Sequence, residues 1–288
     1  MRSGFVAVAG RPNVGKSTLV NALTGSKVAI VSDKPHTTRH RIRGVYTDDD
    51  AQLVLVDLPG WQRPVDRMTE RMQERVHETI EGEDVDAVLL VVSARDRIGA
   101  GDRFVARKVF SLGVPVVIVV NKIDRLKPGH VASQMKAAAE LGSFHALHPV
   151  SALTNDGIDE LRADLVSLLP EGPQYFPADT DTDMPLEARI AELVREQALK
   201  LVREELPHAI TAEVVELDDR LVHVRLYTET ESQKQILIGK GGQMVREIGT
   251  WAWPGVEALL GHKVFLELQV KASPKWRRNE TMLERLGL

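Results

Sequence analysis

The residues best placed to do chemistry lie near the start of the chain, in the run Gly10-Arg11-Pro12-Asn13-Val14-Gly15-Lys16-Ser17-Thr18. This run has the spacing G-x-x-x-x-G-K-S and follows the apolar residues 5–9. A buried strand, a glycine-rich turn and a helix in that order make backbone N–H groups converge on phosphates. Lys16 supplies positive charge for the β- and γ-phosphates, and the Ser17 hydroxyl is a hard oxygen ligand suited to Mg²⁺. The sequence therefore predicts a nucleotide-binding loop.

A second group of residues predicts a response to the γ-phosphate. In Asp57-Leu58-Pro59-Gly60, Asp57 is a candidate magnesium ligand through water, and the Gly60 N–H is a candidate γ-phosphate contact. Residues 35–41 are polar and begin with Pro35, which suits a segment ordered by Mg²⁺ and γ-phosphate. Thr38 is our candidate for the threonine that closes over the metal, with Thr37 as the alternative. Lys16, Thr38 and Gly60 are thus the expected catalytic residues, and Ser17, Thr38 and Asp57 the expected metal ligands.

The position after Gly60 differs from that of Ras-like enzymes, which place a water-orienting glutamine there. Here the residue is Trp61, which has no acceptor for an attacking water. We therefore expect Trp61 to pack rather than to catalyse, and hydrolysis to depend on electrostatic stabilisation by Lys16 and bound cations.

Two further motifs predict which base is bound. In Asn121-Lys122-Ile123-Asp124, the Asp124 carboxylate can accept from two neighbouring guanine donors, which adenine lacks. Lys122 has a long stem that can cover the base, and Ser151-Ala152 places a backbone N–H near guanine O6. Each motif follows a predicted strand, so their side chains meet where α/β sheets bind ligands. The sequence predicts a preference for GTP over ATP.

The elements that position these motifs form an α/β pattern. Short apolar runs alternate with amphipathic ones from residue 4 to 170, which predicts a mostly parallel sheet covered by helices on both faces. The turn Asp48-Asp49-Asp50 predicts a hairpin and one antiparallel edge strand. The expected strands are residues 5–9, 42–47, 51–57, 87–92, 116–121 and 146–150, and the expected helices 66–81, 101–112, 129–141 and 157–169.

Residues 171–186 are rich in proline and acidic residues, which predicts a linker between a GTP-binding domain at 1–170 and a second domain at 187–288. The second domain reads helix-strand-strand-helix-helix-strand, a small α+β unit. Its last helix contains Pro254-Gly255, which predicts a kink or a split there. We expect the neighbouring Trp251 and Trp253 to pack in the core or on the surface, with stacking on bases as the alternative.

The second domain contains a candidate RNA site. Gly239-Lys240-Gly241-Gly242 matches the G-x-x-G loop of KH domains, in which backbone N–H groups clamp phosphates of about four nucleotides. Lys240 adds positive charge, and the apolar Ile236 and Ile238 are expected to floor a groove for unstacked bases. The other RNA-binding candidates lie in the tail: Lys271, Lys275, Trp276 and Arg277, with Trp276 preferred for base stacking.

The motifs GRPNVGKS, HTTRHR, DLPGW, NKID and SAL, with the KH-type loop and the tail, resemble those of the Era family of bacterial GTPases over essentially the whole chain. The resemblance implies a P-loop GTPase domain followed by a type II KH domain, with GTP/GDP and Mg²⁺ as cofactors. It further implies binding to the 3′ end of 16S ribosomal RNA and to the precursor of the 30S subunit, whose assembly the protein assists. Related GTPases use an asparagine at the position of Asn13 to help bind K⁺, so we expect K⁺ there.

Composition limits the other classes of function. The 288 residues carry a net charge of −4, so RNA binding must rest on a local site rather than on an overall basic surface. The chain contains no cysteine, which removes disulfides and thiolate metal sites. The phosphate loop starts at residue 10, so we expect no cleaved signal peptide, and we expect a cytoplasmic monomer.

Alternatives remain open at this stage. One is an RNA chaperone whose GTP site is structural and hardly turns over. Another is a tRNA-modification GTPase, but such a protein should carry a C-terminal cysteine or a folate-binding domain, and neither is present. Peripheral attachment to the inner face of the membrane is a third, because residues 190–206 are amphipathic, although their polar face mixes Glu and Arg.

Overall fold

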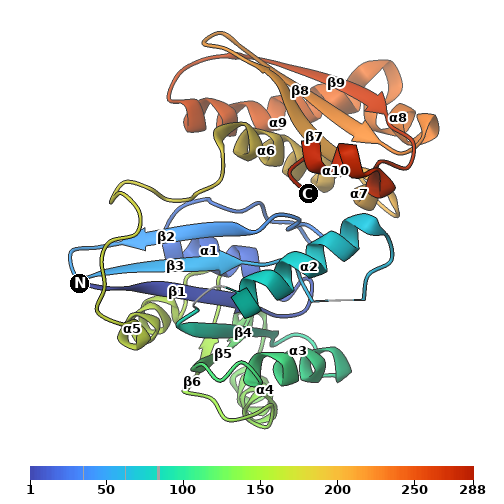
Figure 1. The fold of residues 1–288 in the computed structure, drawn as a ribbon. Coiled ribbons are helices and arrows are strands. Elements are labelled where there is room, and N and C mark those ends of the chain that lie inside the picture. The colour runs from blue at the N-terminus through green and yellow to red at the C-terminus, as the bar shows by residue number, and fades with distance from the viewer. Residues whose placement is uncertain (35, 62, 83–84) are drawn as a thin grey trace. The chain divides into compact units, whose positions relative to one another are not determined.

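The computed structural model describes residues 1–34, 36–61, 63–82 and 85–288, and the chain forms two compact units, shown in Figure 1. The first unit comprises Met1–Ala29, Thr38–Pro64 and Met72–Asp183, and the second comprises Ile30–Thr37, Val65–Arg71 and Met184–Leu288. Two short segments from the N-terminal half therefore pack within the second unit. No helix in the described part of the chain is long and apolar enough to cross a membrane.

The first unit is built on a six-stranded sheet with the order β2-β3-β1-β4-β5-β6. All neighbouring strands are parallel except β2 and β3, which confirms the predicted hairpin and antiparallel edge strand. Strands β3, β4 and β5 are buried throughout, as expected of apolar strands covered on both faces. The strands are β1 (Arg2–Ala9), β2 (Ile42–Thr47), β3 (Ala51–Asp57), β4 (Ala87–Ser93), β5 (Val116–Asn121) and β6 (Ala146–Val150).

Helices cover both faces of this sheet. Helices α1 (Lys16–Thr24) and α5 (Ile158–Leu168) share one apolar core with the sheet. Helices α2 (Arg67–Gly82), α3 (Ala100–Phe110) and α4 (Pro128–Ala139) contribute to a second core on the opposite face. The predicted helices and strands are confirmed to within three residues at each end. The loops that carry the predicted nucleotide motifs follow the carboxyl ends of β1, β3, β5 and β6, so they gather at one edge of the sheet.

The segment predicted to be a linker lies against the first unit as far as Asp183. Thr182 forms a bridge with Gly44 of β2, and the Val45 N–H donates to the Asp181 carbonyl at 2.9 Å. The Arg43 guanidinium pairs with the Asp183 carboxylate at 3.1 Å. This part of the chain is thus anchored along the edge strand.

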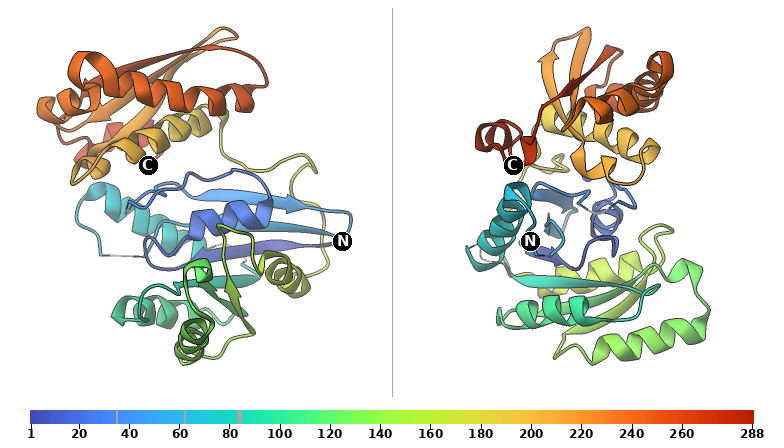
Figure 2. Two further views of the ribbon diagram at one scale, coloured as in Figure 1. Left: turned by 180° about the vertical axis from the view of Figure 1, so that it is seen from behind. Right: turned by 90° about the vertical axis from the view of Figure 1, so that its right-hand side faces the viewer.

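The second unit has a three-stranded sheet, β7-β8-β9, with β7 and β8 antiparallel and β8 and β9 parallel. Helices α6 and α9 pack against each other and share one core with the strands (Figure 2). The predicted helix-strand-strand-helix-helix-strand order is confirmed, while the short helices α7 and α10 were not predicted. The elements of this unit are α6 (Leu186–Leu201), α7 (Leu206–Ala209), β7 (Thr211–Leu217), β8 (Leu221–Thr228), α8 (Glu231–Ile238), α9 (Gln243–Leu260), β9 (Phe265–Ala272) and α10 (Glu280–Arg285), with the one-turn helices η2 (Lys240–Gly242) and η3 (Trp276–Arg278). The one-turn helix η1 (Ile123–Arg125) lies in the first unit.

Helix α9 runs without a break through Pro254, so of the kink or split that we predicted there, the split is wrong. Packing on both sides of the proline holds the helix together: Ala252 and Val256 are buried in the core. Trp253 is also fixed, because its indole N–H donates to the Val264 carbonyl at 2.8 Å. These contacts outweigh the one backbone hydrogen bond that a proline removes.

Candidate functional site

The phosphate loop between β1 and α1 makes close contact with two other motifs. Gly15 has φ 98°, and a Cβ added there would lie 2.4 Å from Nδ2 of Asn121. A Cβ on Gly60 would lie 2.7 Å from the backbone nitrogen of Pro12. Only glycine permits such close approaches. The phosphate loop, the D-x-x-G motif and the motif that contains Asn121, which we predicted to lie together, therefore meet in space.

Lys16 lies buried within this loop. Its ammonium donates to the carbonyl oxygens of Gly10 at 3.2 Å and Arg11 at 3.1 Å. Burial lowers the pKa of Lys16 to about 8, and the nearby Asp57 carboxylate opposes that shift. A desolvated positive charge at the start of a helix is well suited to binding phosphate groups.

Three hard oxygen atoms converge beside Lys16. The Ser17 hydroxyl lies 2.7 Å from both Thr38 Oγ1 and Asp57 Oδ2, and Thr38 Oγ1 lies 3.5 Å from Asp57 Oδ2. Burial raises the pKa of Asp57, and the Lys16 charge opposes this. Asp57 Oδ1 is buried and has no hydrogen-bond partner within the described residues. Two hydroxyls and a carboxylate with an unsatisfied oxygen fit the ligand preference of Mg²⁺.

The structure distinguishes between the two candidate threonines. Thr37 Oγ1 donates to the Lys34 carbonyl at 2.7 Å, whereas Thr38 joins Ser17 and Asp57. Thr38 is therefore the threonine placed at the oxygen cluster. Pro35, which we expected to flank this segment, lies outside the described residues.

At the base-binding end, Asn121 ties the phosphate loop to the other motifs. Its buried amide donates to the Val14 carbonyl at 3.1 Å. Its side-chain oxygen accepts from the backbone N–H groups of Lys122 at 2.8 Å and Ala152 at 3.1 Å. Asn121 thus acts as a scaffold for the site.

Asp124 and Lys122 are both held by neighbours. The Ser151 hydroxyl donates to Asp124 Oδ1 at 2.8 Å, while the Ser151 N–H donates to the Asp156 carbonyl at 2.9 Å. Lys122 donates through Nζ to the Asn13 carbonyl at 2.5 Å. Ser151 therefore orients the carboxylate that would recognise guanine, a role that the sequence did not indicate.

Trp61 has the packing role predicted for it. Its side chain is buried in the core under α2, and its ring meets His77 edge-on with centroids 5.9 Å apart. Its backbone N–H donates to the Gly10 carbonyl at 3.4 Å. Trp61 thus anchors the end of the D-x-x-G motif to the phosphate loop.

The predicted KH-type loop joins α8 to α9. Gly239, Gly241 and Gly242 have φ of 74°, 60° and 78°, which glycine adopts without strain. A Cβ on Gly239 would lie 2.9 Å from the Met244 backbone nitrogen. Lys240 is exposed at the tip, beside the N-terminus of the 18-residue helix α9. The loop therefore presents backbone N–H groups and a positive charge together.

The other RNA-binding candidates differ in accessibility. Ile236 is 52% exposed, Ile238 is half-buried, and Lys271 and Lys275 are exposed. These four remain accessible to a ligand.

The structure corrects the prediction for Trp276 and gives Arg277 two ion-pair partners. Trp276 is completely buried and donates through its indole N–H to the Ala209 carbonyl at 2.8 Å, so the base-stacking prediction is wrong. The Arg277 guanidinium pairs with Asp66 at 3.2 Å and with Glu229 at 3.3 Å. Both residues therefore stabilise the second unit.

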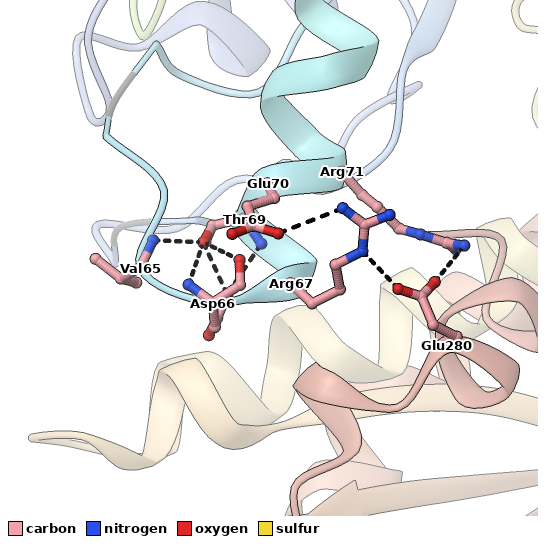
Figure 3. A network of polar contacts seen from close by, with 7 residues as sticks. All are labelled: Val65, Asp66, Arg67, Thr69, Glu70, Arg71 and Glu280. Atoms are coloured by element: carbon pink, nitrogen blue, oxygen red, sulfur yellow. Dashed lines mark hydrogen bonds and ion pairs between the residues drawn. The ribbon is translucent and has the colours of Figure 1, made fainter.

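A network in the second unit was missed altogether (Figure 3). Arg67 and Arg71, near the start of α2, both pair with Glu280 of α10, at 2.5 and 2.6 Å. The Asp66 carboxylate accepts from the Thr69 N–H at 2.9 Å, which fixes the start of α2. These are charged residues on short helical segments, and no pattern of spacing indicated that they would meet.

The phosphate loop, the oxygen cluster and the guanine motif, with a glycine loop in the second unit, define a P-loop GTPase joined to a KH domain. Two family models match accordingly: 50S ribosome-binding GTPase over residues 5–122 and KH domain over residues 205–277. GTPase Era of Mycobacterium tuberculosis (strain H37Rv) is 46% identical over 99% of this chain and 98% of that protein. GTPase Era of Alkaliphilus metalliredigens is 41% identical with the same coverage. The chain belongs to the Era family and is a GTPase.

Solved structures agree. Era in complex with MgGDPNP and nucleotides 1506–1542 of 16S ribosomal RNA matches with a TM-score of 0.95 at 36% identity, over 100% of this chain and 99% of that one. A single-substitution variant of Aquifex aeolicus Era bound to GDP·AlF₄⁻ matches with a TM-score of 0.92 at 36% identity, with the same coverage.

The buried Lys16 gives the first prediction. Below about pH 8 the folded, nucleotide-free protein buries the charged ammonium of Lys16, which lowers the free energy of unfolding. This loss of stability disappears as the pH rises from about 8, the pKa in the folded protein, toward 10.5, the ordinary pKa of lysine. Lys16→Met should therefore stabilise the nucleotide-free protein at pH 7 and remove the gain in stability between pH 8 and 10. Urea unfolding of nucleotide-free protein at several pH values measures this. Equal pH dependence in both proteins would contradict it.

Asp124 gives the second prediction. Asp124→Asn replaces one of the two acceptor oxygens expected to face guanine by an NH₂ donor, so affinity for GDP should fall about tenfold to a hundredfold. Affinity for xanthosine diphosphate, which has an acceptor in place of the exocyclic amine, should rise. Competition binding measures both, with Asp156→Asn as the control for the lost charge. An unchanged preference for GDP would show that Asp124 does not read the base.

Proposed function

We propose that this GTPase is a nucleotide-controlled switch that binds the 3′ end of 16S ribosomal RNA and acts in assembly of the 30S subunit. The observation that carries the proposal is the full-length similarity to an Era solved with MgGDPNP and 16S nucleotides 1506–1542. The residues suited to each ligand are present: Lys16 and the oxygen cluster for the nucleotide, and the exposed Lys240 in its glycine loop for RNA.

We assign Ser17, Thr38 and Asp57 as the residues that hold Mg²⁺. The ion, when bound, neutralises charge on the β- and γ-phosphates. Lys16 adds a fixed positive charge for the same oxygens, and the Gly60 N–H is the proposed donor to the γ-phosphate. Trp61 contributes no acceptor for water, so the chain's own contribution to hydrolysis is electrostatic.

Coupling to RNA is supported by the composition of the second unit. Residues 30–37, which lead to Thr38, and residues 65–71, which follow the D-x-x-G motif, pack with the KH elements. If binding of the γ-phosphate moves Thr38 or Gly60, it therefore also moves the adjoining segments, which contact α6, η3 and α10. Hydrolysis would remove the γ-phosphate contacts, let these segments move back and so change RNA binding.

The RNA test uses a single-stranded RNA that copies the 16S 3′ end, with GDP and then GDPNP. Binding should be tighter with GDPNP. Lys240→Asp combined with Gly241→Asp should abolish binding, because it repels phosphate and strains the loop; Lys127→Asp, at an exposed lysine of the first unit, should not. Equal binding with both nucleotides would remove the coupling, and no binding at all would remove the RNA assignment.

We further propose that K⁺ stimulates hydrolysis through Asn13, whose backbone has φ 64° in the phosphate loop. Turnover should be about tenfold faster in KCl than in NaCl, because a second cation would stabilise developing negative charge. Asn13→Ala should remove the difference. Equal turnover in the two salts would contradict the proposal, and negligible turnover in both would favour the RNA chaperone with a structural GTP site.

We propose a cytoplasmic monomer. One chain provides all the candidate nucleotide- and RNA-binding residues. The helix considered for membrane attachment is engaged elsewhere, since Ile190, Val194 and Ala198 of α6 are fully buried in the core.

A further inference from the structure

Helix α6 carries a group of buried polar residues, comprising Glu192, Arg195, Glu196 and Gln197. Arg195 is 0% exposed and Glu196 is 2% exposed. Buried charges are costly unless they are paired and hydrogen-bonded, so each needs a specific partner. Some of these partners lie in residues 30–37, the segment that precedes Thr38.

Arg195 binds this segment at its end. The Glu192 carboxylate accepts two hydrogen bonds from the Arg195 guanidinium, with Oε1 2.7 Å from Nε and Oε2 2.6 Å from Nη2. From that position Nη2 also donates to the backbone carbonyl of Thr37. Because Glu192 fixes the fork, the donor points in one direction.

Other contacts hold the same segment. Glu196 Oε1 accepts from the backbone N–H of Val31 at 2.9 Å. The His36 ring lies edge-on to that of His208, with centroids 5.1 Å apart. The segment is therefore held both through its backbone, by Arg195 and Glu196, and through the ring of His36.

The Thr37 carbonyl belongs to the same planar peptide as the Thr38 N–H. A donor that fixes this carbonyl therefore fixes the plane from which the Thr38 side chain extends toward Ser17, 2.7 Å away. We propose that Arg195 is a positioning residue for Thr38, so that Mg²⁺-dependent binding of GTP depends on a side chain of the KH-containing unit. The inference rests on the role proposed above for Thr38.

The test compares how strongly Mg²⁺ slows dissociation of fluorescent GDPNP and GDP from the full chain. Thr38→Ala should reduce the Mg²⁺ effect on GDPNP about tenfold to a hundredfold and leave GDP unchanged. Arg195→Met should reproduce this pattern, and the double variant should be no worse than Thr38→Ala, because both changes remove one interaction. In GTP hydrolysis by Arg195→Met, kcat should fall by a larger factor than the factor by which KM changes.

Two further variants guard against a merely structural effect. Arg195→Lys keeps the charge but loses the fork, so it should keep the fold and still show a reduced Mg²⁺ effect. Glu196→Gln keeps an acceptor oxygen for the Val31 N–H, so the effect of Mg²⁺ on its GDPNP dissociation should stay within about twofold of that in the unmodified protein. If Thr38→Ala lowers the Mg²⁺ effect and neither Arg195 variant does, the inference is wrong. If Thr38→Ala has no effect, the proposed role of Thr38 fails instead.

Discussion

The crowding of oxygen atoms around Ser17 is the interaction on which the rest of the site depends. A buried carboxylate and two hydroxyls lie within hydrogen-bond distance of one another, and the charge of Lys16 offsets part of the cost of burying Asp57. The three oxygens come from α1, from the segment after it and from the end of β3. Gly60 supports their convergence, because its lack of a side chain lets the loop after β3 lie against the backbone of Pro12 in the phosphate loop.

The division into two units passes next to this site. Thr37 belongs to the second unit and Thr38 to the first, while α2 changes unit between Arg71 and Met72. The two segments that we propose respond to a γ-phosphate are therefore each shared between units. No long chain of contacts is needed for nucleotide state to reach the KH elements, because the covalent backbone itself connects them.

The nucleotide site was largely predictable from sequence because its chemistry lies in short runs with fixed spacing. The buried strands were equally clear from their apolar pattern. The failures concern residues whose environment is set by distant parts of the chain. Trp276 and Arg195 have charged neighbours in the sequence and look like surface residues, yet both are buried. Trp276 donates to the carbonyl of Ala209 and Arg195 to that of Thr37, and the local sequence cannot reveal these distant acceptors. The split predicted at Pro254 was wrong for the same reason. The cost of a proline in a helix follows from the local sequence, whereas the packing that offsets this cost comes from distant parts of the chain.

The pairing of residues 181–183 with β2 also protects the protein from self-association. An edge strand with free N–H and C=O groups is a template on which another chain can add a strand. An isolated first unit that stopped at residue 170 would expose the backbone of Gly44 and Val45 and would tend to aggregate. One that continued to Asp183 would retain the covering segment, so the practical limit of this domain lies beyond its last helix.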